Sequence, residues 1–357
     1  EVLSNSQQGS ETQSLARYFV AHSLIQRSFY GTALPLLLDL VTSKWRRSAI
    51  GMATKCIEKT RDDSAALQII SKIAVSQIPE EFRSVYSYHL GKSLMSSGAA
   101  SAAIAAFEKV PAGHVRFPEA QYYIGVIQAS DLGSSAKAED WEKEGSDLYQ
   151  TRAHFELALS ASAEQGASDL RDLVQLSLGR LAYQAKQYHR SIYHYSEVSR
   201  DSPFLKEALF ESAWGLYRIG EFNRSLGTLH PIGSKYLEGR DFPELWILRS
   251  LNYLKLCRFN EASVAANTFE KSFAPLEAEF STAAAQIRGD STLNLATLKS
   301  DKISAWVRDW LLSDPVVKKD NDAVKFLEKE KEKLALLRTN PRVNNAELRE
   351  AASDALI

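Results

Sequence analysis

Two histidines in the stretch YHRSIYHY, His189 and His194, are the first residues whose type and spacing could support metal chemistry. Paired histidine ligands on a helix lie four residues apart, which places both rings on one face. His189 and His194 lie five residues apart and straddle the predicted start of a helix. The spacing therefore does not favour a metal site.

Neither the acidic pairs nor the short motifs of the sequence indicate a catalytic site. Asp62-Asp63 and Glu80-Glu81 lie at expected turns, where they suit helix N-termini or solvent better than acid–base chemistry. The sequence contains no Gly-x-Ser-x-Gly elbow, no phosphate-binding glycine loop and no dinucleotide-binding fingerprint. Cys56 and Cys257 form neither a disulfide framework nor a zinc motif. The sequence thus predicts no catalytic residue, no metal site and no cofactor.

A third candidate is the stretch AWGLYRIGEFNRSL, from Ala213 to Leu226, which combines a Trp, a Tyr, two Arg and an acid. Aromatic and arginine side chains are enriched at binding hot spots, because they offer a large rigid surface with a polar end. The same residue types could also serve only the packing of helices, so the elements that carry them have to be identified.

Composition limits the classes of protein to consider. The chain has 357 residues, is 45% hydrophobic and has a formal net charge of −1. This balance suits a folded protein and gives no overall field toward nucleic acid or an anionic membrane. No apolar run approaches the eighteen residues that a membrane-spanning helix needs. The polar start without Met suits either a chain matured by signal cleavage or a shortened one.

Apolar residues recur at intervals of three and four, broken by Gly, Pro or Asp about every fifteen residues, which predicts short antiparallel helices. An internal repeat is also visible. When the segment from Asp172 to Pro203 is aligned with the stretch around Ala213, Lys186 falls on Gly220 and Ser191 on Ser225, at a constant offset of 34 residues.

This pattern resembles the tetratricopeptide repeat (TPR), a helix–turn–helix unit of 34 residues. The best unit has Leu178-Gly179, Tyr188, Ser191, Tyr195 and Pro203 at the characteristic positions. The resemblance implies an all-α superhelical solenoid of antiparallel helix pairs with a C-terminal helical cap. It predicts a polar lead over residues 1–13, about seven units over 14–275 that begin near 14, 47, 84, 118, 172, 206 and 243, and a capping or interaction region over 276–357.

Two segments depart from the repeat. Residues 129–147 hold about fourteen more residues than the unit needs, and they are either a tolerated loop or a projecting binding loop. Residues 276–357 include an amphipathic segment with Trp306 and Trp310 and a charged helix with Phe326 and Leu327. This region is expected to cap the array, or alternatively to form a coiled-coil arm.

TPR arrays bind along a concave groove lined by the first helix of each unit. The positions that the resemblance assigns to this groove are Tyr18, His22, Tyr88, Lys92, Tyr122, Arg180, Tyr183, Phe210, Trp214, Tyr217, Arg218 and Lys255. About half of the aromatic residues are expected to pack between neighbouring first helices. The mixed aromatic and basic character suits a peptide, an acidic segment or a C-terminal carboxylate.

The leading hypothesis is a non-enzymatic scaffold that binds a protein or peptide partner in this groove, without nucleic acid and without membrane insertion. The style of the units is similar to that of bacterial cell-envelope TPR proteins, which implies a periplasmic or envelope location, with the cytoplasm as the alternative. A second hypothesis is a groove for a small ligand such as a glycan or cell-wall fragment. A third is a helical barrel enzyme, which lacks paired carboxylates in the predicted groove.

Overall fold

A computed structural model describes residues 11–60, 63–132, 137–233, 243–289 and 315–339, together with Ser304, Val307 and Trp310. Within these ranges the chain forms α-helices and short 3-10 turns, and no strand. The prediction of an all-α fold is therefore confirmed. None of the helices in the described ranges is long and apolar enough to cross a membrane.

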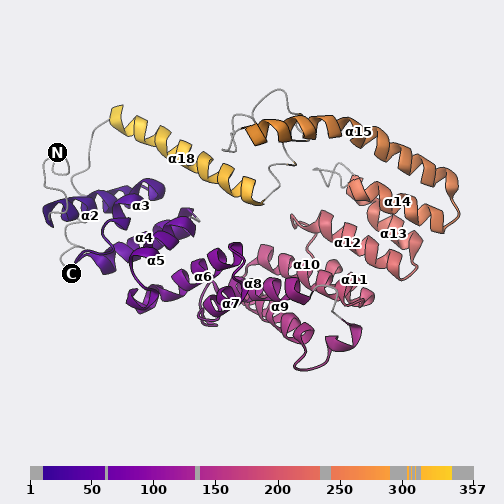
Figure 1. Ribbon diagram of the computed structural model, residues 1–357, viewed down its shortest axis with the longest axis horizontal. Coiled ribbons are helices and arrows are strands. Elements are labelled where there is room, and N and C mark those ends of the chain that lie inside the picture. The colour runs from indigo at the N-terminus through magenta and orange to yellow at the C-terminus, as the bar shows by residue number, and fades with distance from the viewer. Residues whose placement is uncertain are drawn as a thin grey trace. The chain divides into compact units, whose positions relative to one another are not determined.

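Consecutive helices pack as antiparallel pairs (Figure 1). Each pair consists of a first and a second helix, as the repeat predicts, and the connection is short except between α8 and α9, where the inserted segment lies. The pairs are α2 (Glu11–Gln26) with α3 (Tyr30–Leu38), α4 (Arg46–Thr60) with α5 (Asp63–Lys72), α6 (Glu80–Ser96) with α7 (Ala100–Phe107), α8 (Phe117–Leu132) with α9 (Asp147–Glu164), α10 (Ser168–Gln184) with α11 (Tyr188–Ser196), α12 (Leu205–Arg218) with α13 (Phe222–Leu229), and α14 (Pro243–Lys255) with α15 (Phe259–Gly289).

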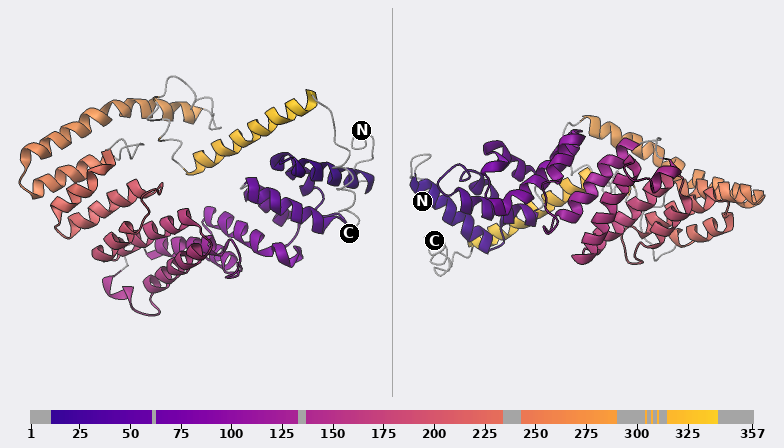
Figure 2. Two further views of the ribbon diagram at one scale, coloured as in Figure 1. Left: turned by 180° about the vertical axis from the view of Figure 1, so that it is seen from behind. Right: turned by 90° about the horizontal axis from the view of Figure 1, so that it is seen from below.

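The chain divides into two compact units. The first comprises the described residues up to Ala120 and those from Asp322 onward, and the second comprises those from Gln121 to Asn321. In the second unit, the pairing of α12 with α13 and of α14 with α15 is visible from two further directions (Figure 2). The helix α18 (Pro315–Thr339) begins in the second unit and ends in the first.

The core of the first unit shows why its helices form. On α4 the residues Ala49, Ile50, Ala53, Cys56 and Ile57 are completely buried. Their spacing of three and four residues lines one face of a helix, which packs against α2, α3, α5 and α6. A buried hydrogen bond between the hydroxyls of Thr54 and Tyr86, 3.2 Å long, joins α4 to α6.

Close contact between the two helices of a pair depends on glycine. A Cβ atom at Gly91 of α6 would lie 2.7 Å from the ring of Phe107 in α7, and one at Gly125 of α8 would lie 2.8 Å from the ring of Phe155 in α9. Gly179 of α10 faces Tyr195 of α11 in the same way. The aromatic ring of the second helix therefore packs directly against the small residue that the repeat predicts in the first helix.

The turns within the pairs share one conformation. Lys186 and Gly220, which the repeat places at equivalent positions, have φ angles of 60° and 83°. In both turns the next amide donates to a carbonyl five residues earlier, Gln187 N to Ala182 O at 2.8 Å and Glu221 N to Leu216 O at 2.9 Å. This is the Schellman arrangement, which ends a helix with a left-handed residue. It reverses the chain in two residues and makes the pair antiparallel.

The last pair differs from the expected layout. The sequence predicted that the repeat array ends at residue 275, and α15 continues through this residue from Phe259 to Gly289. Beyond it, Trp310 packs edge-on against Phe280 of α15, with ring centroids 4.9 Å apart, and the amide of Ser304 donates to Glu279 at 3.3 Å. Trp306 lies outside the described residues. A helical cap on the last pair is consistent with these contacts, while the boundary at 275 stays a prediction.

The inserted segment packs against the repeats instead of projecting from them. The first residues of the insertion, 129–132, belong to the end of α8. A 3-10 turn, η3 (Ala138–Trp141), precedes α9. The side chain of Trp141 is 2% exposed, and the guanidinium groups of Arg152 and Arg190 lie over its ring, 5.5 and 5.8 Å from the ring centroid. Residues 133–136 lie outside the described residues. For the described part of the insertion, the projecting binding loop weighed from the sequence is therefore not what the structure shows.

Candidate functional site

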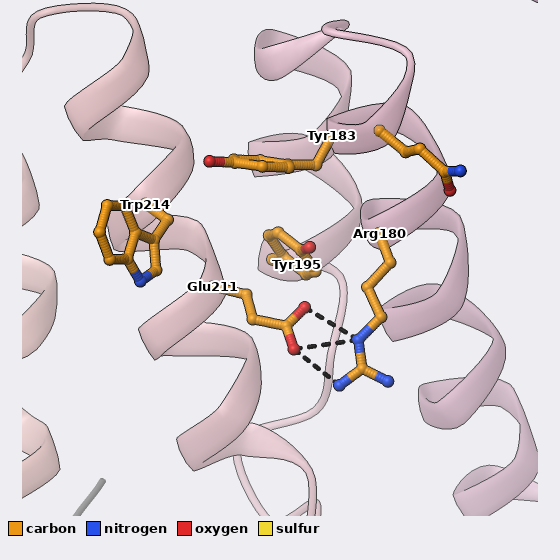
Figure 3. Close-up of a pocket in the computed structure, with 6 residues that line it drawn as sticks. Arg180, Tyr183, Tyr195, Glu211 and Trp214 are labelled. Atoms are coloured by element: carbon orange, nitrogen blue, oxygen red, sulfur yellow. Dashed lines mark hydrogen bonds and ion pairs between the residues drawn. The ribbon is translucent and has the colours of Figure 1, made fainter. Parts of the chain in front are cut away.

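A pocket of about 440 Å³ lies in the second unit, between α10, α11 and α12 (Figure 3). Tyr183 of α10 and Trp214 of α12 stand on two sides of it, and Tyr195 of α11 lies between them. Arg180 and Glu211 reach across its floor. Gln184 completes the lining. Three helices from two consecutive pairs therefore contribute to one cavity.

Arg180 is the most constrained charge of the pocket. Its Nε donates to both carboxylate oxygens of Glu211, at 2.9 and 3.0 Å, and its Nη2 donates to Glu211 at 2.6 Å and to Glu207. The two carboxylates and the hydrogen bonds raise the pKa of Arg180 against the opposing effect of burial. One guanidinium between two carboxylates leaves this cluster with a net charge of −1.

This electrostatic balance corrects the expected character of the groove. A free Arg180 would attract an acidic segment or a terminal carboxylate. The observed Arg180 already binds two carboxylates, and a new anion would have to displace one of them. Arg180 is therefore committed to two glutamates, although the basic side chain is present where the sequence predicted it.

The aromatic walls are held by polar contacts. The Nε of Arg218 donates to the hydroxyl of Tyr183 at 3.1 Å and connects α12 to α10. Trp214 packs edge-on against Tyr217, with ring centroids 5.8 Å apart. Burial, followed by the negative charge of Glu211, raises the pKa of Tyr195, so this phenol stays neutral. The walls are thus positioned before any ligand arrives.

The other predicted groove residues of the second unit lie outside the pocket lining. Tyr122, Phe210 and Tyr217 are half-buried, and Lys255 is exposed. The phenol of Tyr122 is hydrogen bonded to Ser177, and burial raises its pKa. Tyr217 contacts Phe222 of α13, with ring centroids 5.5 Å apart. Of the predicted set, the pocket thus brings together Arg180, Tyr183 and Trp214.

In the first unit, two predicted groove residues are not exposed. Tyr18 is 3% exposed because it stacks on Trp45, 5.2 Å between ring centroids, and Tyr88 is 4% exposed because it packs against Phe107 beneath Arg116. The expectation that these two rings line an open groove is therefore wrong, since both serve contacts between helices. The neighbouring His22 and Lys92 are half-buried.

Sequence reasoning missed half of the pocket. Tyr195 was assigned only to packing, and Glu211 and Gln184 were not assigned at all, because the repeat pattern names neither position. One signal was available: Glu207 and Glu211 are four residues apart on α12, so both face the same neighbour. That the neighbour is Arg180 depends on how α10 and α12 stack.

Two histidines, His194 and His154, take structural roles by contacting glutamine side chains. The Nδ1 of His194 lies 2.9 Å from Oε1 of Gln175, and His154 makes the same contact with Gln121 at 2.7 Å. Burial, followed by the positive charges of Arg190 and Arg152, lowers the pKa of His194 to about 4. Within the described ranges no group of three or more His, Cys, Asp or Glu residues is placed to hold a metal ion.

Known proteins resemble this chain in structure but not in sequence. No protein-family description matches the sequence, and no curated protein matches it. A tetratricopeptide repeat protein from Parabacteroides merdae is 11% identical, with a TM-score of 0.42, over 72% of this chain and 92% of that one. The C-terminal part of a TPR repeat-containing protein from Cytophaga hutchinsonii is 15% identical, with a TM-score of 0.44, over 71% and 94%.

The apo form of RapI is 12% identical, with a TM-score of 0.35, over 88% of this chain and 98% of that one. At these values the similarity concerns the fold alone. In the part of the chain that the structure describes, the helices follow one another as consecutive pairs.

Proposed function

We propose that this chain is a protein-binding scaffold and that the pocket between α10, α11 and α12 receives a side chain of a peptide segment from its partner. The observation that carries the proposal is the convergence of Tyr183, Trp214 and Arg180 on one cavity of about 440 Å³. Ligand sites are concave, largely apolar and provided with a few placed polar groups. Here the polar groups are the Arg180–Glu211 pair and the Tyr195 hydroxyl.

The chemistry of the pocket favours an apolar or aromatic side chain flanked by neutral or basic residues. The rings of Tyr183 and Trp214 offer faces for stacking, and the two glutamates that already bind Arg180 disfavour an incoming carboxylate. The partner is proposed to be a protein rather than nucleic acid, because the arginine that lines this pocket is already bound to Glu207 and Glu211.

Selection from a random peptide library tests the proposal. Peptides selected on the intact protein should bind the Trp214→Ala variant at least tenfold more weakly in fluorescence anisotropy, because a buried aromatic anchor contributes about 2 kcal/mol or more. Tyr193→Ala is the matched control, since Tyr193 is an aromatic residue of α11 that is 58% exposed and does not line the pocket. Thermal melts of both variants check that the fold is intact.

Equal binding by the intact protein and the Trp214→Ala variant would contradict the pocket assignment. The alternative ligand class is a glycan or cell-wall fragment, which could stack on the same two rings. Binding on a glycan or muropeptide array that is lost in Trp214→Ala, without any selected peptide, would favour that alternative.

The location in a bacterial envelope is a separate proposal. It is supported by the resemblance of the repeat units to those of cell-envelope TPR proteins. Fractionation of cells that express the native gene tests it: recovery with periplasmic or envelope fractions supports the proposal, and recovery with the cytoplasm contradicts it.

A further inference from the structure

The N-terminus of α3 binds a carboxylate from a residue almost three hundred positions away. Glu330, in the part of α18 that belongs to the first unit, accepts hydrogen bonds from the amides of Gly31 and Thr32, 3.0 and 2.9 Å long. The hydroxyl of Thr32 donates a third bond at 2.8 Å. The side chain of Glu330 is only 5% exposed, although its neighbours on α18 face solvent.

The carboxylate takes the place of a missing helix cap. The N-cap residue of α3 is Phe29, whose side chain makes no capping hydrogen bond. The amides of the second and third helical residues are those that an N-cap oxygen ordinarily accepts from, and here they belong to Gly31 and Thr32. The negative charge of Glu330 also lies at the positive end of the helix dipole. Glu330 therefore satisfies donors that the local sequence leaves unpaired.

Side chains of α18 pack directly against the backbone of Gly31. The three atoms nearest to a Cβ placed at Gly31 all belong to α18: Glu330 Oε2 at 3.1 Å, Leu327 Cδ2 at 3.2 Å and Phe326 Cε1 at 3.3 Å. An alanine at this position would need these side chains to yield by a few tenths of an ångström. The absence of a side chain at Gly31 thus permits the approach of a helix with Phe, Leu and Glu at positions i, i+1 and i+4.

The contact between α18 and α3 buries little apolar surface. Leu327 remains 53% exposed and Val324 36% exposed, so little apolar surface is buried beside the carboxylate. Docking that depends on a single charged residue and few apolar contacts has a low free energy of opening, as expected for segments that detach without global unfolding.

We propose that the N-terminus of α3 is a docking site for a helix that presents one carboxylate, and that α18 of the same chain is its occupant, held as a reversible latch by Glu330. The recognised features are the Glu330 carboxylate, the Leu327 and Phe326 side chains on Gly31, and the hydroxyl of Thr32. When α18 is docked the site is closed to other helices, and when α18 leaves, the N-terminus of α3 is open to a carboxylate from another helix. This latch is independent of the pocket in the second unit.

Hydrogen exchange of the full-length protein tests the latch. Glu330→Gln should accelerate exchange of the Gly31 and Thr32 amides roughly tenfold or more, because a hydrogen bond to a charged acceptor is replaced by a weaker one. Glu328→Gln is the matched control, since Glu328 is an exposed acid on the same helix. Unchanged exchange at Gly31 and Thr32 in Glu330→Gln would overturn the proposal.

Gly31→Ala gives a second, independent readout. A purely structural α3 would be stabilised by alanine within the helix, whereas a docking site would lose α18 to the added Cβ. The expected result is faster exchange in α18 together with slower exchange in α3. Slower exchange in both helices would mean that the added Cβ does not displace α18, which contradicts the assigned role of Gly31.

A synthetic peptide of residues 315–339 tests occupancy directly. It should bind the Glu330→Lys protein at least tenfold more tightly than the intact protein, in which α18 fills the site, and the peptide with Gln at position 330 should bind weakly. Equal binding of the peptide to both proteins would overturn the latch. Protection of Gly31 that rises with protein concentration would identify a second copy's helix as the occupant and would overturn the intramolecular contact.

Discussion

At the scale of single residues, the packing of three pairs depends on a glycine that faces an aromatic ring. Gly91 and Phe107, Gly125 and Phe155, and Gly179 and Tyr195 repeat the same contact in three pairs. The sequence placed these residues at repeat positions for a small residue and an aromatic. The structure adds that no Cβ fits between them without a shift of the ring.

Gly125→Ala is expected to lower the free energy of unfolding by about 1–3 kcal/mol, because the added methyl overpacks the contact with Phe155. The control is Gly227→Ala in α13, where nothing lies within 4 Å of the added Cβ. There the gain in helix propensity should stabilise the protein by up to about 1 kcal/mol. Urea denaturation followed by circular dichroism measures both. Equal effects of the two substitutions would refute the packing argument.

The buried side chain of His194 makes the stability of the protein depend on pH. The pKa of His194 is about 4 in the folded protein, against an ordinary value of 6.5, because it is buried near Arg190 and Arg152. The unfolded chain therefore binds a proton that the folded chain does not, between about pH 6.5 and pH 4. The contribution of His194 to stability is complete above pH 6.5 and is lost as the pH falls.

Denaturation midpoints measured from pH 7 to pH 4.5 should fall less steeply for His194→Gln than for the intact protein. The substitution removes the titrating group and retains a polar side chain beside Gln175. His189→Gln is the control, because His189 is exposed. Identical slopes for His194→Gln and the intact protein would show that His194 is not protonated on unfolding in this range.

At the scale of elements, the insertion between α8 and α9 stabilises the second unit. Trp141 is almost completely buried among α9 and α10 residues that include Leu148, Phe155 and Leu181. Glu142 pairs with Arg190 at 2.8 Å and with Arg152 at 3.2 Å, and Gln187 donates to Ala138 O at 3.0 Å. The 3-10 turn therefore fastens α9 to α11 across the pair boundary.

Trp141→Ala is expected to cost about 3–5 kcal/mol, the usual loss for truncation of a buried large aromatic side chain. Hydrogen exchange should accelerate in residues 137–146 and in α9. Leu157→Ala serves as the control, since Leu157 lies on α9 and is 48% exposed. A loss no larger than that of Leu157→Ala would contradict an anchoring role for the insertion.

At the scale of the whole molecule, the helix pairs within each unit contact their neighbours in sequence, and stability should follow the same pattern. Repeat arrays behave as chains of units coupled mainly to their nearest neighbours. The first unit has its own core around Ile50, Ile57 and Ile69, and the second has a core around Phe155, Leu178 and Leu181. A substitution that destabilises one core is therefore not expected to accelerate hydrogen exchange in the other.

Ile57→Ala should destabilise the first unit by about 2–5 kcal/mol and should accelerate exchange in α4 and α5. Exchange in α10 to α13 should stay within error of the intact protein. Leu181→Ala is the reciprocal variant in the second unit. Uniform acceleration along the whole chain after either substitution would show that the protein unfolds as a single cooperative unit.

The sequence by itself determined the helical class, the pairing of helices and the repeat positions of small and aromatic residues, because these depend on spacing within one repeat of about 34 residues. It also placed Arg180, Tyr183 and Trp214 among candidate contact residues. Only the tertiary structure decided that Tyr18 and Tyr88 are buried, that Glu207 and Glu211 neutralise Arg180, and that Glu330 caps α3. These contacts join residues that no local period relates, so their partners follow from how the helices stack rather than from their positions along the chain.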